Sequence, residues 1–92
     1  MASYRVTYWR AIPTQVEAFD ASGRVRRALD ARFQALVDAV AMREGLAGTD
    51  AYLAGWHVGP VLERQGPPQA VAEAVAAELE AQFDAIRAAT RT

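Results

Sequence analysis

The 92-residue sequence contains no cysteine and no lysine, and all ten of its basic residues are arginine. The lack of cysteine excludes disulfide bonds, thiolate metal sites, iron–sulfur clusters and cysteine nucleophiles. The lack of lysine excludes a Schiff-base lysine and a phosphate-binding P-loop. His57 is the single histidine, so a multi-histidine metal site within one chain is also excluded. We therefore expect no metal site, no cofactor and no catalytic residue of these kinds.

The composition and charge are those of an ordinary globular domain. Apolar residues make up 52% of the sequence and charged residues 23%, which is typical of a chain that folds around one core. The formal net charge of −1 lacks the basic excess of a nucleic-acid binder. No apolar run approaches the ~20 residues of a membrane span, and no leader follows Met1. We expect a single cytoplasmic domain over residues 1–92 that binds neither nucleic acid nor membranes.

The charge is divided unevenly along the chain. Residues 1–45 hold seven arginines and five acidic residues, a net charge of +2. Residues 46–92 hold three arginines and six acidic residues, a net charge of −3. The simpler interpretation is that the two halves attract each other inside one domain. The alternative is head-to-tail association or association with a partner.

Alternating residues at the start of the chain predict a β-hairpin. Aromatic and β-branched side chains alternate over residues 4–10, and a second strand is predicted over residues 15–20. Pro13 cannot donate a ladder hydrogen bond, so pairing is expected to pause there. One face of the first strand carries Tyr4, Val6 and Tyr8, which places Trp9 on the other face.

Two apolar stripes with a period of 3.6 residues predict two helices. The first helix is expected to run about 20 residues from Gly23, with Ser22 as its cap and Gly45 as its closing residue. The second is expected from Pro67 to about Ala88. The stripes are formed by Val25, Leu29, Phe33, Leu36, Val37 and Val40, and by Val71, Val75, Leu79, Phe83 and Ile86.

A third strand is predicted within residues 55–64, where Gly59-Pro60 interrupts the strand-like residues. Residues 46–53 stay ambiguous, and Thr49 or Asp50 is a candidate cap for a single helical turn through Tyr52. The order is strand–strand–helix–strand–helix. The expected fold is an α+β two-layer sandwich, a three-stranded sheet with both helices on one face. A right-handed crossover would make the first strand central.

Arg24, Arg26 and Arg27 form the candidate anion-binding site. In the predicted helix they occupy the first turn, where the helix dipole is already positive. An anion held by the helix N–H groups and the guanidinium groups would reverse this unfavourable charge. The alternative is that Asp20, Asp30 and the acidic residues of the last helix neutralise the arginines.

Trp9 and Phe19 form the candidate protein interface. If the helices cover the face that carries Tyr4, Val6 and Tyr8, then Trp9 lies on the uncovered face, where Phe19 could join it. Large aromatic side chains on such a face are typical of a contact surface. The alternative is that a loop or a chain terminus packs over them. His57, by contrast, is interpreted as structural or merely exposed, because no motif supplies it with an orienting partner.

Two stretches of the sequence resemble a known family. One covers residues 4–16 and contains Tyr-Trp-Arg followed by Ile-Pro; the other covers residues 32–56 and contains Asp-Ala-Tyr-Leu and Gly-Trp. They are similar to the small bacterial "virulence factor" domain, which also occurs at the C-terminus of conserved virulence factor C. The resemblance marks a set of characteristic residues: Trp9, Arg10, Pro13, Asp50, Tyr52, Gly55 and Trp56.

The missing nucleophiles and metal ligands, the exposed edges of a three-stranded sheet and the aromatic second face favour a non-enzymatic accessory or interaction module. The resemblance supplies no known catalytic residues, and it suggests a role beside one-carbon (folate and corrinoid) enzymes. A protein partner or a homodimer is expected. The alternative function is a small-ligand or anion-binding domain at the arginine cluster. Trp56 is expected in the core, with its indole N–H bonded to a carbonyl or carboxylate, because Gly55 permits a close approach of the backbone.

Overall fold

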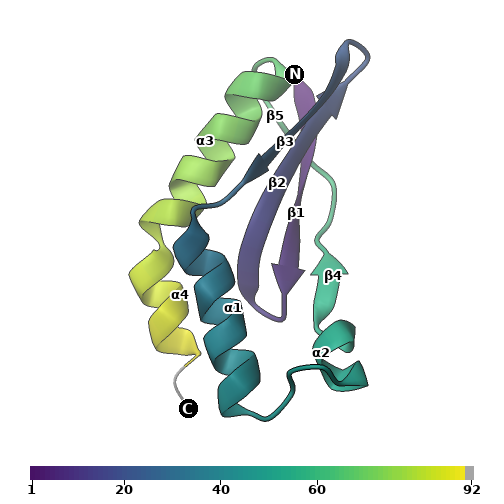
Figure 1. Ribbon diagram of the computed structural model, residues 1–92. Coiled ribbons are helices and arrows are strands. Elements are labelled where there is room, and N and C mark those ends of the chain that lie inside the picture. The colour runs from purple at the N-terminus through teal and green to yellow at the C-terminus, as the bar shows by residue number, and fades with distance from the viewer. Residues whose placement is uncertain (91–92) are drawn as a thin grey trace.

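The computed structural model describes residues 1–90 and contains one five-stranded antiparallel sheet and four helices in these residues (Figure 1). The strands are β1 (Ala2–Trp9), β2 (Ile12–Asp20), β3 (Gly23–Ala28), β4 (Trp56–Val58) and β5 (Leu62–Arg64). The helices are α1 (Ala31–Arg43), α2 (Asp50–Ala54), α3 (Pro68–Ala81) and α4 (Phe83–Ala89).

Strand β1 is the centre of the sheet. The strand order is β3-β2-β1-β4, and β5 also pairs with β1, beside its first residues. The predicted hairpin of β1 and β2 and the inner position of β1 are confirmed. β4 and β5 lie end to end along the same side of β1, so each holds only three residues.

The expected fold of three strands and two helices is wrong, and the largest error is at residues 23–28. This segment is strand β3 and forms a second hairpin with β2. Ser22 is therefore not a helix cap. Its backbone N–H donates to Oδ1 of Asp20 at 2.8 Å and closes the hairpin turn. Val25 and Leu29 stand four residues apart, a spacing that fits one helix face and also two inward positions of a strand, so they did not discriminate between the two.

The second difference is that predicted elements are divided. The predicted third strand forms two, β4 and β5, because Gly59-Pro60 breaks the ladder between them. The last helix is two helices that meet at Gln82. The ambiguous segment does contain a short helix, and Oγ1 of Thr49 accepts a hydrogen bond from the Tyr52 N–H, as the capping hypothesis predicts. Gly45 has a φ of 69° and follows the end of α1, as expected.

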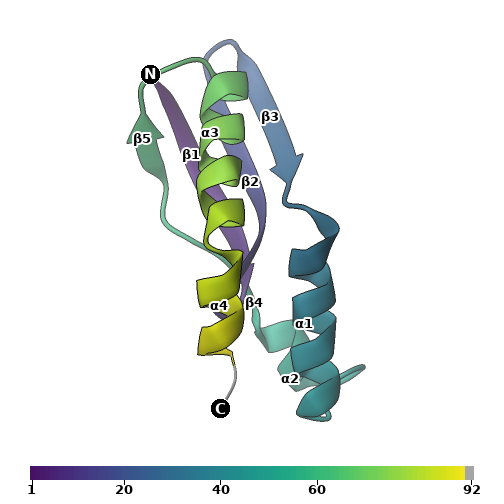
Figure 2. The same ribbon diagram turned by 90° about the vertical axis from the view of Figure 1, so that its left-hand side faces the viewer.

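The long helices cover one face of the sheet (Figures 1 and 2). α3 runs across β1, β2 and β3, whereas α1 contacts β2. The rings of Phe33 and Phe83 meet edge to face at 5.1 Å and join α1 to α4. Within residues 1–90, no helix has the length and apolarity to span a bilayer. The largest fully buried side chains are Trp9, Phe33, Ile12, Val16, Val37, Val71 and Pro13.

Trp9 is in the core, which contradicts its expected place on an uncovered face. Its exposed fraction is 0%. Its indole Nε1 donates to the Tyr52 carbonyl oxygen at 2.8 Å. A Cβ on Gly55 would lie 2.6 Å from the same nitrogen, so only glycine fits there. The physical reason is that the chain from α2 to β4 folds over the end of β1, where a bulge opposite Thr7 and Tyr8 also breaks the strand alternation.

The expectation of a core Trp56 with a hydrogen-bonded indole is wrong, because Trp9 is the tryptophan with these properties. Trp56 is half-buried, pairs with Trp9 across the β1–β4 ladder and meets Tyr52 edge to face at 6.2 Å. The close approach at Gly55 is real, but it serves the tryptophan of β1 rather than the one that follows the glycine.

The two tryptophans should therefore differ in their effect on stability. Trp9→Ala should lower the free energy of unfolding by about 3–5 kcal/mol, because it empties a fully buried site and removes the bond to Tyr52. Trp56→Ala should cost clearly less, since this side chain is only half-buried. Urea denaturation followed by circular dichroism measures both. Equal losses, or a larger loss for Trp56→Ala, would contradict this assignment.

Candidate functional site

The uncovered face of the sheet carries a buried carboxylate. Glu17 lies in β2 opposite Arg5 of β1 and Arg26 of β3, so all three share the face that the helices leave open. Glu17 is nevertheless only 6% exposed. A buried charge is stable only when it is paired and hydrogen-bonded, and the side chains around Glu17 supply both.

Three arginines bind the two oxygens of this carboxylate. Arg5 Nε lies 2.6 Å from Oε1, whereas Arg24 Nη1 and Arg26 Nε lie 2.9 and 3.2 Å from Oε2 of Glu17. The arginine side chains are themselves 37%, 51% and 67% exposed. Three guanidinium groups and one carboxylate leave this cluster, which we call the arginine cluster, with a formal charge of +2.

The environment of Glu17 changes its acidity. Burial alone would raise the pKa of the carboxyl group, but the hydrogen bonds from Arg24, Arg5 and Arg26 together outweigh burial. The pKa of Glu17 falls from 4.5 to about 2. The carboxylate is therefore ionised at any physiological pH, and it holds the three guanidinium groups in place.

Phe19 adds an apolar surface to the arginine cluster. Its ring lies between two guanidinium groups, with the central carbons of Arg5 and Arg24 at 5.6 and 5.2 Å from the ring centre. Such contacts favour arginine over an aromatic face. Phe19 is half-buried on the uncovered face. Its predicted role in an interface stays a prediction, and Trp9 does not lie beside it on this face, because Trp9 is buried.

The structure separates the three arginines predicted to share a helix N-terminus. Arg24 and Arg26 lie on the uncovered face of β3, and Arg27 lies on the helix-covered face opposite Val16. The prediction of an anion site at a helix N-terminus is wrong, because strands direct successive side chains to opposite faces.

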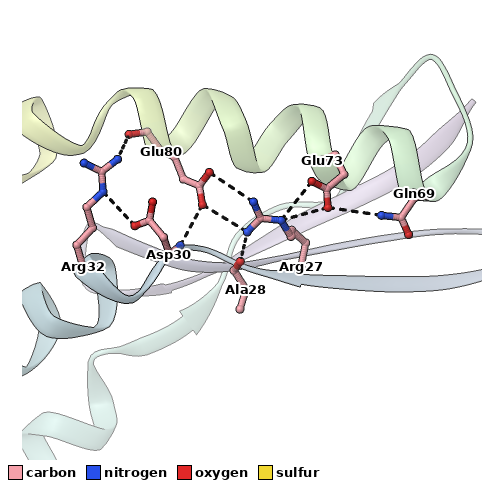
Figure 3. Close-up of polar contacts among 7 residues, drawn as sticks. All are labelled: Arg27, Ala28, Asp30, Arg32, Gln69, Glu73 and Glu80. Carbon is pink, nitrogen blue, oxygen red and sulfur yellow. Dashed lines mark hydrogen bonds and ion pairs between the residues drawn. The ribbon is translucent and has the colours of Figure 1, made fainter.

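Acidic residues of α3 surround Arg27, as the alternative interpretation stated (Figure 3). Nε of Arg27 lies 3.1 Å from Glu73 Oε1, and Nη1 lies 3.4 Å from Glu80 Oε2. The hydrogen bond that Arg27 donates to Glu73 is the largest cause of a raised pKa for Arg27. Its guanidinium also donates to the Ala28 carbonyl oxygen. Arg27 therefore joins β3 to α3 and is not available to a ligand.

Most of the motif residues meet at the end of β1. Arg10 has a positive φ of 53° in the β1–β2 turn, its N–H donates to the Gly55 carbonyl at 2.8 Å, and its Nη1 lies 2.8 Å from Oε1 of Glu44. Nε2 of His57 lies 2.7 Å from the Arg10 carbonyl oxygen, which can only accept, so this nitrogen carries the proton. The His57 ring also stacks on Tyr8 at 5.5 Å.

Four of the motif residues make contacts that join two segments of the fold. Trp9, Arg10, Tyr52 and Gly55 hold the α2–β4 segment against the end of β1. The remaining motif residues are Pro13, which is buried in β2, Asp50, which begins α2, and Trp56, which begins β4.

A cavity of about 200 Å³ lies beside Arg10. It is smaller than the ~300 Å³ of ordinary ligand pockets, and the guanidinium of Arg10 is already bound by Glu44.

Strand β3 presents an open backbone edge beside the arginine cluster. The Leu29 N–H donates to the Thr14 carbonyl, which fixes the alternation of the β2–β3 ladder. In that alternation the N–H and C=O groups of Arg24 and Arg26 point away from β2. Within residues 1–90, no strand pairs with this side of β3.

Two members of the arginine cluster, Arg5 and Glu17, are absent from the sequence predictions. The sequence contains a pattern that could have predicted the pair of Glu17 and Arg26. The turn at residues 20–23 lies between two strand-like segments, and a tight hairpin there sets Glu17 opposite Arg26. Opposite charges across a strand pair are favourable. Because residues 23–28 were interpreted as a helix, this cross-strand pair was not predicted.

The fold and the arginine cluster define a small α+β domain with a covered face, an open basic face and β3 at an edge of the sheet. A family model described as "Virulence factor" matches residues 7–90, and the chain belongs to this family. The resemblance derived from the two motif stretches is thereby confirmed. No curated protein and no solved structure matches the chain.

Replacing the central carboxylate should destabilise the domain in a pH-dependent way. Because the folded pKa of Glu17 lies below its ordinary value, its ionised form stabilises the fold above pH ~4.5, and this stability is lost as the pH falls toward 2. Glu17→Gln should cost about 1–3 kcal/mol near pH 7, since the arginine partners are partly solvated.

Urea denaturation at about pH 7 and about pH 3 measures this effect. The difference between wild type and Glu17→Gln should shrink at the lower pH. Glu63→Gln is the matched control, since Glu63 is exposed and occupies the same face in β5, and it should change stability by less than about 0.5 kcal/mol. A Glu17→Gln effect that does not vary with pH would contradict the role of the ionised carboxylate.

Proposed function

We propose that this domain is a non-enzymatic protein-interaction module that binds its partner on the β3 side of the sheet. The observation that carries the proposal is the free edge of β3 beside a cluster of charge +2. An unpaired strand edge is a ready template for another chain. Four of the motif residues support it indirectly, since Trp9 binds Tyr52 and Arg10 binds Gly55 at the end of β1, away from the arginine cluster.

A role beside one-carbon enzymes is the finer form of this proposal. It rests on the family resemblance alone, and identification of the bound partner tests it. A folate- or corrinoid-dependent enzyme as partner supports this role, and any other partner ends it while the interaction module stands.

Small-anion binding is the second candidate function. It is favoured by the two terminal nitrogens of Arg26, to which no hydrogen bond is assigned within residues 1–90. Phosphate or citrate should then raise the melting temperature of the wild type, and Arg26→Gln should remove that rise. No thermal shift across phosphate, folate and nucleotide would end this candidate.

Site-specific photocrosslinking tests the interaction module. A benzophenone side chain at Ala28, which is exposed in β3, should crosslink one discrete protein in the native host. The same group at Ala77 of α3 or Ala85 of α4, both exposed on the helical side, should not. Mass spectrometry then identifies the product, and purified components confirm binding. Crosslinking from all three positions alike, or from none, would contradict the proposal.

A further inference from the structure

We propose that the β3 edge binds an extended acidic segment of a partner protein, which adds one strand to the sheet and sets its carboxylates beside Arg24 and Arg26. This inference rests on the proposed function and specifies the chemistry of the partner. Strand addition combines backbone hydrogen bonds, which supply affinity, with side-chain contacts at alternate positions, which supply specificity.

The backbone of β3 offers the longer continuous edge of the sheet. β3 spans six residues, whereas the opposite edge consists of β4 and β5, three residues each, separated by Gly59, Pro60 and Val61. Pro60 has no N–H to donate. A strand added to β3 finds the N–H and C=O groups of Arg24 and Arg26 directed toward it.

The side chains of β3 favour a partner strand in which acidic and neutral residues alternate. On the uncovered face, Arg24 and Arg26 stand two residues apart and would lie beside every second residue of an added strand. On the helix-covered face, Val25 is half-buried, and Arg27 is already bound by Glu73 and Glu80. Carboxylates are therefore favoured at alternate positions on the uncovered face, and neutral residues at the positions between them.

The same charges disfavour a second copy of this chain as the occupant. Antiparallel pairing of two β3 strands, in the register centred on Val25, would set Arg24 opposite Arg26 of the second copy, and a shift by two residues would set one of these arginines opposite its own copy. Like charges directly opposite each other destabilise a strand pair. The arginines thus protect the edge against self-association and leave it open to a strand of opposite charge.

Glu17 prepares the arginines for this role. Its carboxylate binds Arg24 through Nη1 and Arg26 through Nε, so that both guanidinium groups are ordered before a ligand arrives. Ordering in advance lowers the entropy cost of binding. The cluster keeps its formal charge of +2, because one carboxylate cannot neutralise three arginines.

Synthetic peptides test the inference on the wild-type protein. The probe is a peptide of about eight residues, an ordinary strand length, that alternates glutamate with valine. The first control has the same composition with all glutamates in one half. The second control has the alternating sequence with N-methylated backbone nitrogens at the glutamates, because a residue paired antiparallel with Arg24 or Arg26 shares their face and turns its N–H toward β3. Calorimetry at low salt should detect binding of the probe and binding at least about tenfold weaker for both controls.

Hydrogen exchange and matched variants locate the contact. The probe should slow amide exchange at Arg24 and Arg26, since their N–H groups would donate to the added strand. Arg24→Gln with Arg26→Gln should weaken binding about tenfold or more, whereas Arg87→Gln, at an exposed arginine of α4, should not. Thermal melts confirm that each variant is folded. The N-methylated peptide keeps the test valid if the double variant does not fold.

Each outcome separates this inference from the proposed function. Equal binding of all three peptides, or equal effects of citrate, means general anion binding and overturns strand addition. If no peptide binds but Ala28 still gives a specific crosslink, the domain does bind a protein, and the inference that this partner adds an acidic strand to β3 is wrong. Peptide binding without any crosslinked protein means that the edge accepts acidic strands but that the proposed function is wrong.

Discussion

The buried carboxylate of Glu17 is the interaction on which the uncovered side of the sheet depends. It stands in β2, between β1 and β3, and binds one arginine of β1 and two arginines of β3. A neutral side chain at this position would leave three guanidinium groups close together without a counter-charge. Because the carboxylate is ionised at physiological pH, the face is ordered and basic at the same time. The ordered side chains stabilise the fold, and the positive charge is available to a partner.

The two faces of the sheet have different roles because successive side chains of a strand point to opposite faces. In β3, Arg26 faces solvent and Arg27, one residue later, lies under α3. Identical side chains in adjacent positions thereby acquire different roles, because a strand rotates each residue by half a turn relative to the last. Arg27 ties the hairpin to the helical layer, with Glu73 and Glu80 as its counter-charges (Figure 3).

Sequence reasoning predicted the elements whose periodicity is unambiguous and failed where one pattern fits two structures. The β1–β2 hairpin and the C′ role of Gly45 depend on local chemistry, so they could be predicted from the sequence, whereas the cap of α2 was left open between Thr49 and Asp50 and is Thr49. Residues 23–28 could not, since the spacing of Val25 and Leu29 fits a helix and a strand equally. The burial of Trp9 depends on α2, more than 40 residues away, and no local pattern carries that information.

The buried core around Trp9 and the proposed binding site lie at different places in the sheet, and this separation makes the binding site testable. The indole of Trp9 and the backbone of Tyr52 and Gly55 fix the far end of β1 in the core. Arg24 and Arg26 lie on an edge strand, at least half exposed, and Arg5 still binds the carboxylate of Glu17 when both are replaced. Neutral substitutions at the two arginines therefore lower the attraction of the edge for an acidic strand and also remove the stability that their ion pairs with Glu17 supply, whereas N-methylation of the peptide changes binding alone.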